Sequence, residues 1–332
     1  MQNAMGPRLR HCTLVATADQ EKLTMIVGKE HFELATEGGQ RESFLKFKRY
    51  LDGRNAMPDI SSRSGVALAS VEAIVAQFSA LGLLRTETPS ITIPVADFVA
   101  RIDQSTLMWR RQIGYHRLFG MLERGEGSKD LVVGLLLETY HFVRLASKHI
   151  SVAIAHCGDA YVANILSAYL ADEYRHCKLI ADSIVAAGIP AAQIENAHPV
   201  IGTLSLVNML CEIGRSSTLG YLCCLNLIEA RPQEESEARA AWAAIARKAG
   251  MDEKIFDGLL RHMQIDVKAG HTDLLAEALL NKAVIFAPDA HLAVNQMHDL
   301  KHAFDQFHDQ IIQYYTDVSN YVPRLTVDYF SL

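Results

Sequence analysis

Apolar residues recur at helical spacing along most of the chain beyond residue 95, and short interruptions divide the pattern into segments. Glycine or proline marks several of these interruptions, as at Gly158, Gly188 and Pro232. No alternating apolar and polar pattern of any length appears in this region. The spacing therefore predicts an all-α domain, with helices over 95–124, 128–157, 160–188, 201–231, 235–249, 252–282 and 290–318.

The first 90 residues follow a different pattern. Residues 23–34, LTMIVGKEHFEL, are typical of two short strands joined by a turn at Gly28-Lys29. Short helices are predicted over 41–53, 57–65 and 70–85, while residues 86–94 hold two prolines and no helical periodicity. We therefore expect a mainly α protein in two domains. Residues 1–90 form a small winged-helix-like α+β domain, and residues 91–332 form the helical domain.

Composition narrows the classes of function. The chain has 332 residues and a formal net charge of −6, which argues against nucleic acid as its partner. The third predicted helix, which would read DNA in a winged-helix protein, carries Glu72 and no lysine or arginine. No apolar run reaches the roughly 18 residues of a membrane span, and no signal pattern opens the chain. We expect a cytoplasmic protein with no nucleic-acid and no membrane partner.

Residues 50–84, YLDGRNAMPDISSRSGVALASVEAIVAQFSALGLL, resemble the PqqD-like family, the RiPP recognition elements. The resemblance covers about residues 20–86 and implies that a leader peptide adds as an extra strand beside the hairpin and packs on the third helix. The peptide would then contact Met25, Ile26 and Val27 on the hairpin, and Val75 and Phe78 on the helix. A dimerisation or docking remnant is the alternative for this domain.

Acidic and histidine residues stand inside apolar helical runs of the second domain. Residues 167–185, SAYLADEYRHCKLIADSIV, carry Glu173 and His176, and a separation of three places both side chains on one side of a helix. Four helices that project acids and imidazoles inward are typical of non-haem di-iron centres. The other candidates in apolar runs are Glu138, Glu229, His262, Asp266 and His271.

Four carboxylates and three histidines exceed what one ion needs. Carboxylates are hard donors that tolerate an oxidised metal and can bridge two ions, while imidazoles hold each ion. Several acids in an apolar interior would be very costly without a metal. The pattern predicts two iron ions per chain.

Residues 115–150, YHRLFGMLERGEGSKDLVVGLLLETYHFVRLASKHI, resemble the start of the haem-oxygenase-like fold, in which seven or eight helices surround a central cavity. The di-iron oxidases and oxygenases of that fold take a Glu from their first core helix, matched by Glu138. A Glu and a His follow from the second, matched by Glu173 and His176, and a further Glu from the third, matched by Glu229. We expect His141 and Tyr174 to lie beside the ligands.

The last helix of these enzymes carries HxxxDxxH, and this chain departs from that pattern. His262 and Asp266 match its first two positions, but the third falls on Ala269, and His271 comes two residues later. On a regular helix His271 would lie roughly opposite His262 and Asp266. We expect a π-bulge near Gly270 that brings His271 round as a ligand.

Together these features predict a di-iron enzyme that uses dioxygen to oxidise or oxygenate a precursor peptide held by the first domain. Hydroxylation, C–C cleavage and oxidative decarboxylation all stay open, as does a homodimer. The alternatives are a cofactor-free oxidase like the PQQ-forming enzyme, a thiaminase-like enzyme on the same fold, and a winged-helix ligand-sensing regulator.

Overall fold

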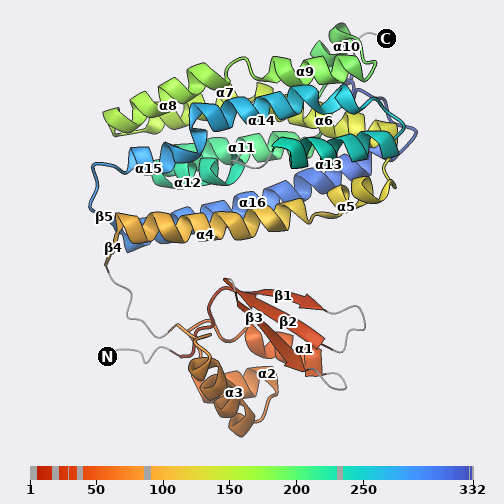
Figure 1. Ribbon diagram of the computed structural model, residues 1–332. Coiled ribbons are helices and arrows are strands. Elements are labelled where there is room, and N and C mark those ends of the chain that lie inside the picture. Colours follow the sequence, from red (N-terminus) through yellow and green to blue (C-terminus); the bar gives the residue numbers. More distant parts are fainter. Residues whose placement is uncertain are drawn as a thin grey trace. The chain divides into compact units, whose positions relative to one another are not determined.

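The computed structural model describes residues 6–16, 22–28, 30–35, 40–85, 91–229, 235–328 and 330. The chain divides into two compact units, Met1–Ser90 and Ile91–Leu332, here called unit 1 and the helical unit (Figure 1). The mainly α fold class predicted from the sequence is confirmed.

Unit 1 holds a three-stranded antiparallel sheet with the order β1-β2-β3. The hairpin β2–β3 was predicted, with Lys29 of its turn outside the described residues, whereas β1 was not predicted. Three short helices follow the sheet, as the spacing indicated. The elements are β1 Thr13–Ala16, β2 Lys22–Val27, β3 Glu30–Ala35, α1 Gln40–Lys48, α2 Met57–Ser64 and α3 Leu68–Ala80.

The core of unit 1 corrects part of the predicted peptide surface. Successive side chains of a strand alternate between its two faces, so Met25 and Val27 point inward, where both are at most 3% exposed. Phe78 of α3 joins the same core at 3% exposed. These three residues hold the unit together and offer no surface to a peptide. Ile26 and Val75 are only half-buried.

The helical unit is built from more and shorter helices than the periodicity predicted. Ser217, for example, divides the segment 201–231, because its extended backbone ends one helix and its hydroxyl caps the next by accepting from the Gly220 amide at 2.9 Å. The spacing of apolar residues does not reveal such a break, because one residue hardly changes it. The helices are α4 Val95–Gly114, α5 Arg117–Arg124, α6 Lys129–Arg144, α7 Ala146–His156, α8 Ala160–Glu173, α9 Cys177–Ala186, α10 Ala191–Glu195, α11 Ile201–Ser216, α12 Thr218–Ile228, α13 Glu235–Lys248, α14 Asp257–Ala269, α15 Leu274–Ala278 and α16 Ala287–Tyr315.

Two three-residue strands also escaped prediction: β4 Thr92–Pro94 pairs antiparallel with β5 Val284–Phe286. One continuous apolar core runs through the helical unit, with α11 packed against α7 and α16, and α12 against α16 and α4. Figure 1 shows α4 and the long α16 lying side by side beneath the other helices. Among the described helices, none is long and apolar enough to cross a membrane.

Candidate metal centre

Glu173 and His176 lie where one predicted helix divides into two. Helix α8 ends at Glu173, α9 begins at Cys177, and a turn joins them, with the His176 amide 3.2 Å from the Glu173 carbonyl oxygen. The break keeps both side chains buried and close, with His176 Nδ1 at 3.2 Å from Glu173 Oε2. The spacing argument for this pair assumed a continuous helix, and the turn achieves the same approach.

Helix α14 supplies the next two groups. His262 and Asp266 are four residues apart and so face the same way, with His262 Nδ1 3.0 Å from Asp266 Oδ2. The second oxygen of Asp266, Oδ1, lies 3.3 Å from His176 Nδ1. Asp266 therefore links α14 to the α8–α9 turn.

His271 reaches the cluster by a different route from the predicted π-bulge. Helix α14 ends at Ala269, because Gly270 adopts a left-handed φ of +75° and closes the helix, and His271 begins a short 3-10 turn at His271–Asp273. The imidazole is 3% exposed. Its Nδ1 lies 3.1 Å from Glu173 Oε1 and 3.4 Å from Glu229 Oε2. The predicted bulge was wrong, although His271 lies in the cluster.

Glu229 follows the last residue of α12, and two residues that the sequence analysis did not single out as partners fix its position. The hydroxyl of Tyr169 donates to Glu229 Oε1 at 2.5 Å. The Arg110 guanidinium donates to the main-chain carbonyls of Leu227, at 3.1 Å, and of Glu229. Asp172, which the sequence analysis also did not single out, is half-exposed and contacts His271 instead. Its Oδ2 lies 3.6 Å from His271 Nε2. All three contacts join segments far apart in sequence, so spacing gave no signal for them.

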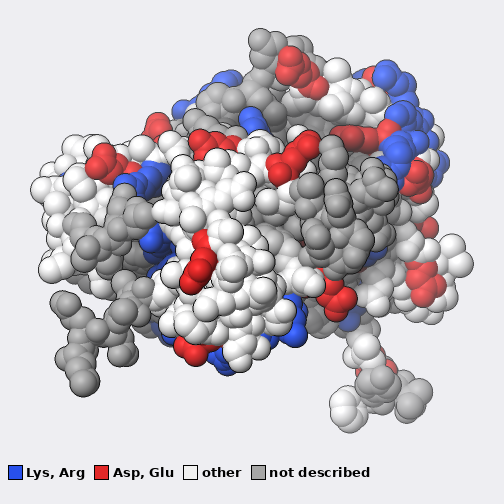
Figure 2. Space-filling view, turned by 90° about the horizontal axis from the view of Figure 1, so that it is seen from below, with Lys and Arg blue, Asp and Glu red and all other residues white. Residues whose placement is uncertain are grey.

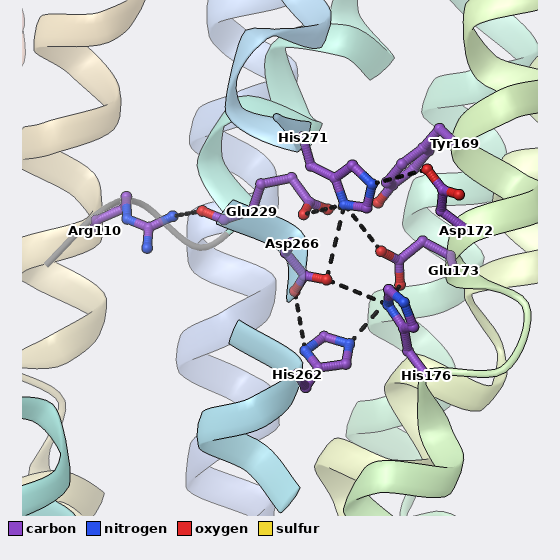
Figure 3. Close-up of polar contacts among 9 residues, drawn as sticks. All are labelled: Arg110, Tyr169, Asp172, Glu173, His176, Glu229, His262, Asp266 and His271. Atoms are coloured by element: carbon purple, nitrogen blue, oxygen red, sulfur yellow. Dashed lines mark hydrogen bonds and ion pairs between the residues drawn. The ribbon is translucent and has the colours of Figure 1, made fainter. Parts of the chain in front are cut away.

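These side chains form two overlapping sets of metal-type ligands (Figure 3). Glu173 and Asp266 belong to both sets. His176 and His262 complete the first set, and Glu229 and His271 complete the second. Within each set the ligand atoms lie within 4.8 Å of one another. Two ligand sets that share two carboxylates have the residue types and proximity that a metal centre needs.

Several polar atoms of this cluster have no hydrogen-bond partner, and this tests whether a metal fits. Among the described residues, nine buried side-chain nitrogen and oxygen atoms have no hydrogen-bond partner, and six of them belong to the cluster. Buried polar atoms without hydrogen-bond partners are costly, so their convergence on one place indicates a cation-binding site. Carboxylates mixed with imidazoles suit iron or manganese. The six atoms are Glu173 Oε1, His176 Nδ1, His262 Nε2, Asp266 Oδ1 and both ring nitrogens of His271.

The acids and imidazoles of the cluster shift one another's pKa values strongly. Burial alone would lower the pKa of His271, but the Glu173 and Glu229 carboxylates raise it to about 10. Burial likewise opposes the charged form of His262, yet Asp266 and Glu173 raise its pKa to about 9. Burial raises the pKa of Glu229 above its usual range. Cations must displace such protons, so metal binding at this cluster should release them.

Glu138 lies outside both ligand sets, contrary to the prediction. It is fully buried, but its carboxylate already accepts hydrogen bonds from the Tyr315 hydroxyl at 2.7 Å, the Val200 amide at 3.1 Å and the Thr203 hydroxyl. Gly134, one turn earlier on α6, gives the Tyr315 ring its space, since a Cβ there would lie 2.2 Å from that ring. Glu138 therefore joins α6 to α11 and α16.

The two residues expected beside the ligands lie elsewhere. His141 is buried on α6, where its Nδ1 lies 3.4 Å from the Arg144 guanidinium and its ring packs on Tyr140. The side chain of Tyr174 is 66% exposed, because it leaves the α8–α9 turn on the solvent side. Tyr169 and Asp172 hold the positions next to the cluster instead.

A family model and several solved structures are similar to the helical unit. Residues 133–297, which contain all six cluster residues, match the family model described as iron-containing redox enzyme. A domain of unknown function with a haem-oxygenase-like fold from Shewanella denitrificans superposes with a TM-score of 0.56 at 16% identity, covering 69% of this chain and 98% of that one. A TenA homologue from Pseudomonas syringae pv. tomato gives a TM-score of 0.48 at 12% identity, covering 68% of this chain and 100% of that one.

A TenA family transcription regulator from a Silicibacter species gives a TM-score of 0.47 at 14% identity, covering 65% of this chain and 96% of that one. No curated protein matches the chain. The helical unit therefore has the haem-oxygenase-like fold, and its residues 133–297 match the iron-containing redox enzymes.

Proposed function

We propose that this protein is a non-haem di-iron enzyme that uses dioxygen to oxidise a precursor peptide. The observation that carries the proposal is the pair of ligand sets sharing Glu173 and Asp266, with six buried atoms that have no hydrogen-bond partner. His176 and His262 would complete one iron position, and His271 and Glu229 the other. Ferrous iron bound there would supply the electrons that activate dioxygen, which side chains alone cannot do.

The chain's own residues prepare these positions. Asp172 faces His271 Nε2 and favours the proton on that nitrogen, so Nδ1 is the nitrogen that would give up its proton to a metal ion. Tyr169 occupies one oxygen of Glu229 and leaves Oε2 facing His271. Arg110 holds the backbone at the end of α12, where Glu229 begins the next segment. Each contact fixes a ligand before any metal arrives.

A cofactor-free oxidase or a thiaminase-like enzyme is a weaker proposal for this chain. Neither would need two adjacent ligand sets. Either would leave six buried polar atoms of the cluster without a hydrogen-bond partner.

The peptide part of the proposal rests on unit 1. Strand β3 stands at the edge of its sheet, and an edge strand can accept an extended peptide. Residues 50–84 resemble the PqqD-like elements, and α3 carries no lysine or arginine for phosphate contacts. On the face shown in Figure 2, Lys and Arg atoms gather near the upper right edge, and elsewhere they are scattered among acidic and uncharged ones. These features favour a peptide over a nucleic acid.

The test uses the full chain loaded anaerobically with Fe(II) and then mixed with dioxygen. We expect iron-dependent absorbance changes and dioxygen uptake faster than with free Fe(II), both abolished by Glu173→Ala. Co-expression with short peptides encoded beside the gene should yield a product whose mass shows oxidation. Dioxygen uptake no faster than that of free iron, in protein that retains its fold, would rule the proposal out.

A further inference from the structure

A cavity of about 520 Å³ opens at the end of the helical unit where β4 and β5 lie. Its walls are mostly apolar and include Val162 of α8, Leu222 of α12 and Leu279, just after α15. Asp159 and Lys282 form an ion pair of 3.3 Å among its lining residues. Asp289 adds a second acid, so the charged lining is net negative.

This cavity is separate from the metal centre but lies on the same helices. Val162 precedes Tyr169 by seven residues, and Leu222 precedes Glu229 by seven, which is about 10 Å along each helix. Helices α8 and α12 therefore both run from the cavity toward the metal centre. Buried leucines, among them Leu166 of α8, occupy the length between.

Strand β5 brings unused backbone amides to this cavity. The hydrogen bonds from Val95 N to Ala283 O, at 3.1 Å, and from Ala287 N to Ile91 O, at 2.9 Å, show which positions face β4. In an antiparallel pair the intervening residues point the other way, so the Val284 and Phe286 amides face away from β4. Within the described residues, neither amide donates a hydrogen bond to another segment.

The two strands differ at their outer edges. Pro94 occupies the outward position of β4 opposite Val284, and it has no N–H to offer. Residues 284–286 of β5 line the cavity, whereas no residue of β4 does. The free edge of the small sheet is therefore the edge of β5 beside the cavity. An apolar space thus adjoins two backbone amides that can donate hydrogen bonds.

We infer that the β5 edge and this cavity form a second peptide site, on the helical unit itself. An extended peptide segment pairs with Val284 and Phe286 and places an apolar side chain in the cavity, while the net negative lining favours a basic residue beside it. A hydrocarbon chain would fill the cavity but leave the amides unused. The inference rests on the proposed peptide substrate and adds where the oxidising unit holds it.

The experiment photo-crosslinks the full-length protein with the peptide acetyl-Lys-Thr-photoleucine-Thr-Leu-Lys-amide and maps the attachment sites by mass spectrometry. We expect adducts among the cavity residues, within 158–162, 217–222 and 278–289. Val284→Pro removes an amide that the β4 ladder does not use, so it should reduce these adducts about tenfold. Val284→Ala keeps the amide and is the matched control, with adducts within about twofold of the original protein.

A second arm needs no variant. The same peptide with methylated backbone nitrogens at alternate positions should give about tenfold fewer adducts in the cavity of the unmodified protein. Equal labelling by both peptides, no adducts in the cavity, or displacement of the peptide by dodecanoate but not by unlabelled peptide would each overturn the inference. Iron loading and dioxygen uptake are measured separately, so their failure would remove the proposed function without altering the map of adducts.

Discussion

At the scale of residues, the contact between Asp172 and His271 decides which nitrogen faces the metal site. Asp172→Asn removes the charge that holds the proton on His271 Nε2. We expect the affinity for one of the two proposed metal ions to fall about tenfold or more. Replacing the hydrogen-bond partner of a metal-binding histidine typically lowers metal affinity by that much. Anaerobic Fe(II) titration measures this. Asp182→Asn, on the exposed side of α9, is the control, and equal affinities in the two variants would contradict the assignment.

A second residue-scale prediction concerns acid stability. Burial, and to a smaller extent the nearby His116, lower the pKa of His308 to about 3 against the opposing effect of Asp305 and Asp309. The unfolded chain has an ordinary histidine pKa near 6.5 and takes up the proton first. His308 therefore has no effect on stability above about pH 6.5 and favours unfolding as the pH falls from there toward 3.

The measurement compares urea unfolding of metal-free protein at pH 7.5 and 5.5. Between these two pH values, the free energy of unfolding should fall by about 1 kcal/mol less in His308→Gln than in the unmodified protein. Identical pH dependence in the two proteins would show that His308 takes up its proton in the folded state as easily as in the unfolded chain.

Residue types and spacing were enough to single out all six side chains of the cluster, because an acid or imidazole inside an apolar helical run is rare unless it has a role. The same signal wrongly predicted Glu138 as a metal ligand. Its neighbours are equally apolar, but its carboxylate accepts hydrogen bonds from Tyr315, Val200 and Thr203. Tyr169 and Asp172 could not be ranked as partners, since their contacts depend on how distant segments pack.

At the scale of elements, the end of α14 positions His271. Gly270 has φ of +75° and a Cβ there would meet almost nothing, so Gly270→Ala adds backbone strain without a clash. Gly250→Ala is matched, with φ of +66° and open space, and lies in another loop. Both should lower the free energy of unfolding by about 1 kcal/mol. Only Gly270→Ala should weaken Fe(II) binding, and equal weakening in both would contradict this role.

Helical periodicity located the helical segments but not their breaks. A turn of two or three residues, such as the one between α8 and α9, barely disturbs the spacing of apolar positions on either side. Strands β4 and β5 are three residues each, too short for alternation to be recognised. The end of α14 was misjudged because a glycine can either bulge a helix or close it, and the sequence alone does not choose.

At the scale of the whole molecule, the two units should respond differently to metal. All described ligand residues belong to the helical unit, so iron should stabilise that unit and leave unit 1 unchanged. Calorimetry of the full chain should show two transitions, with Fe(II) raising the temperature of the larger one only. A single transition that Fe(II) raises as a whole would mean that the chain unfolds as one cooperative body.

The central claim is that two metal ions share Glu173 and Asp266. Its most direct test is iron stoichiometry and Mössbauer spectroscopy of the full chain loaded anaerobically with ⁵⁷Fe(II). The account predicts about two irons per chain, loss of both in Asp266→Ala, loss of one in His262→Ala, and retention of both in Glu138→Gln. A single iron per chain, or loss of iron in Glu138→Gln equal to that in Asp266→Ala, would contradict it.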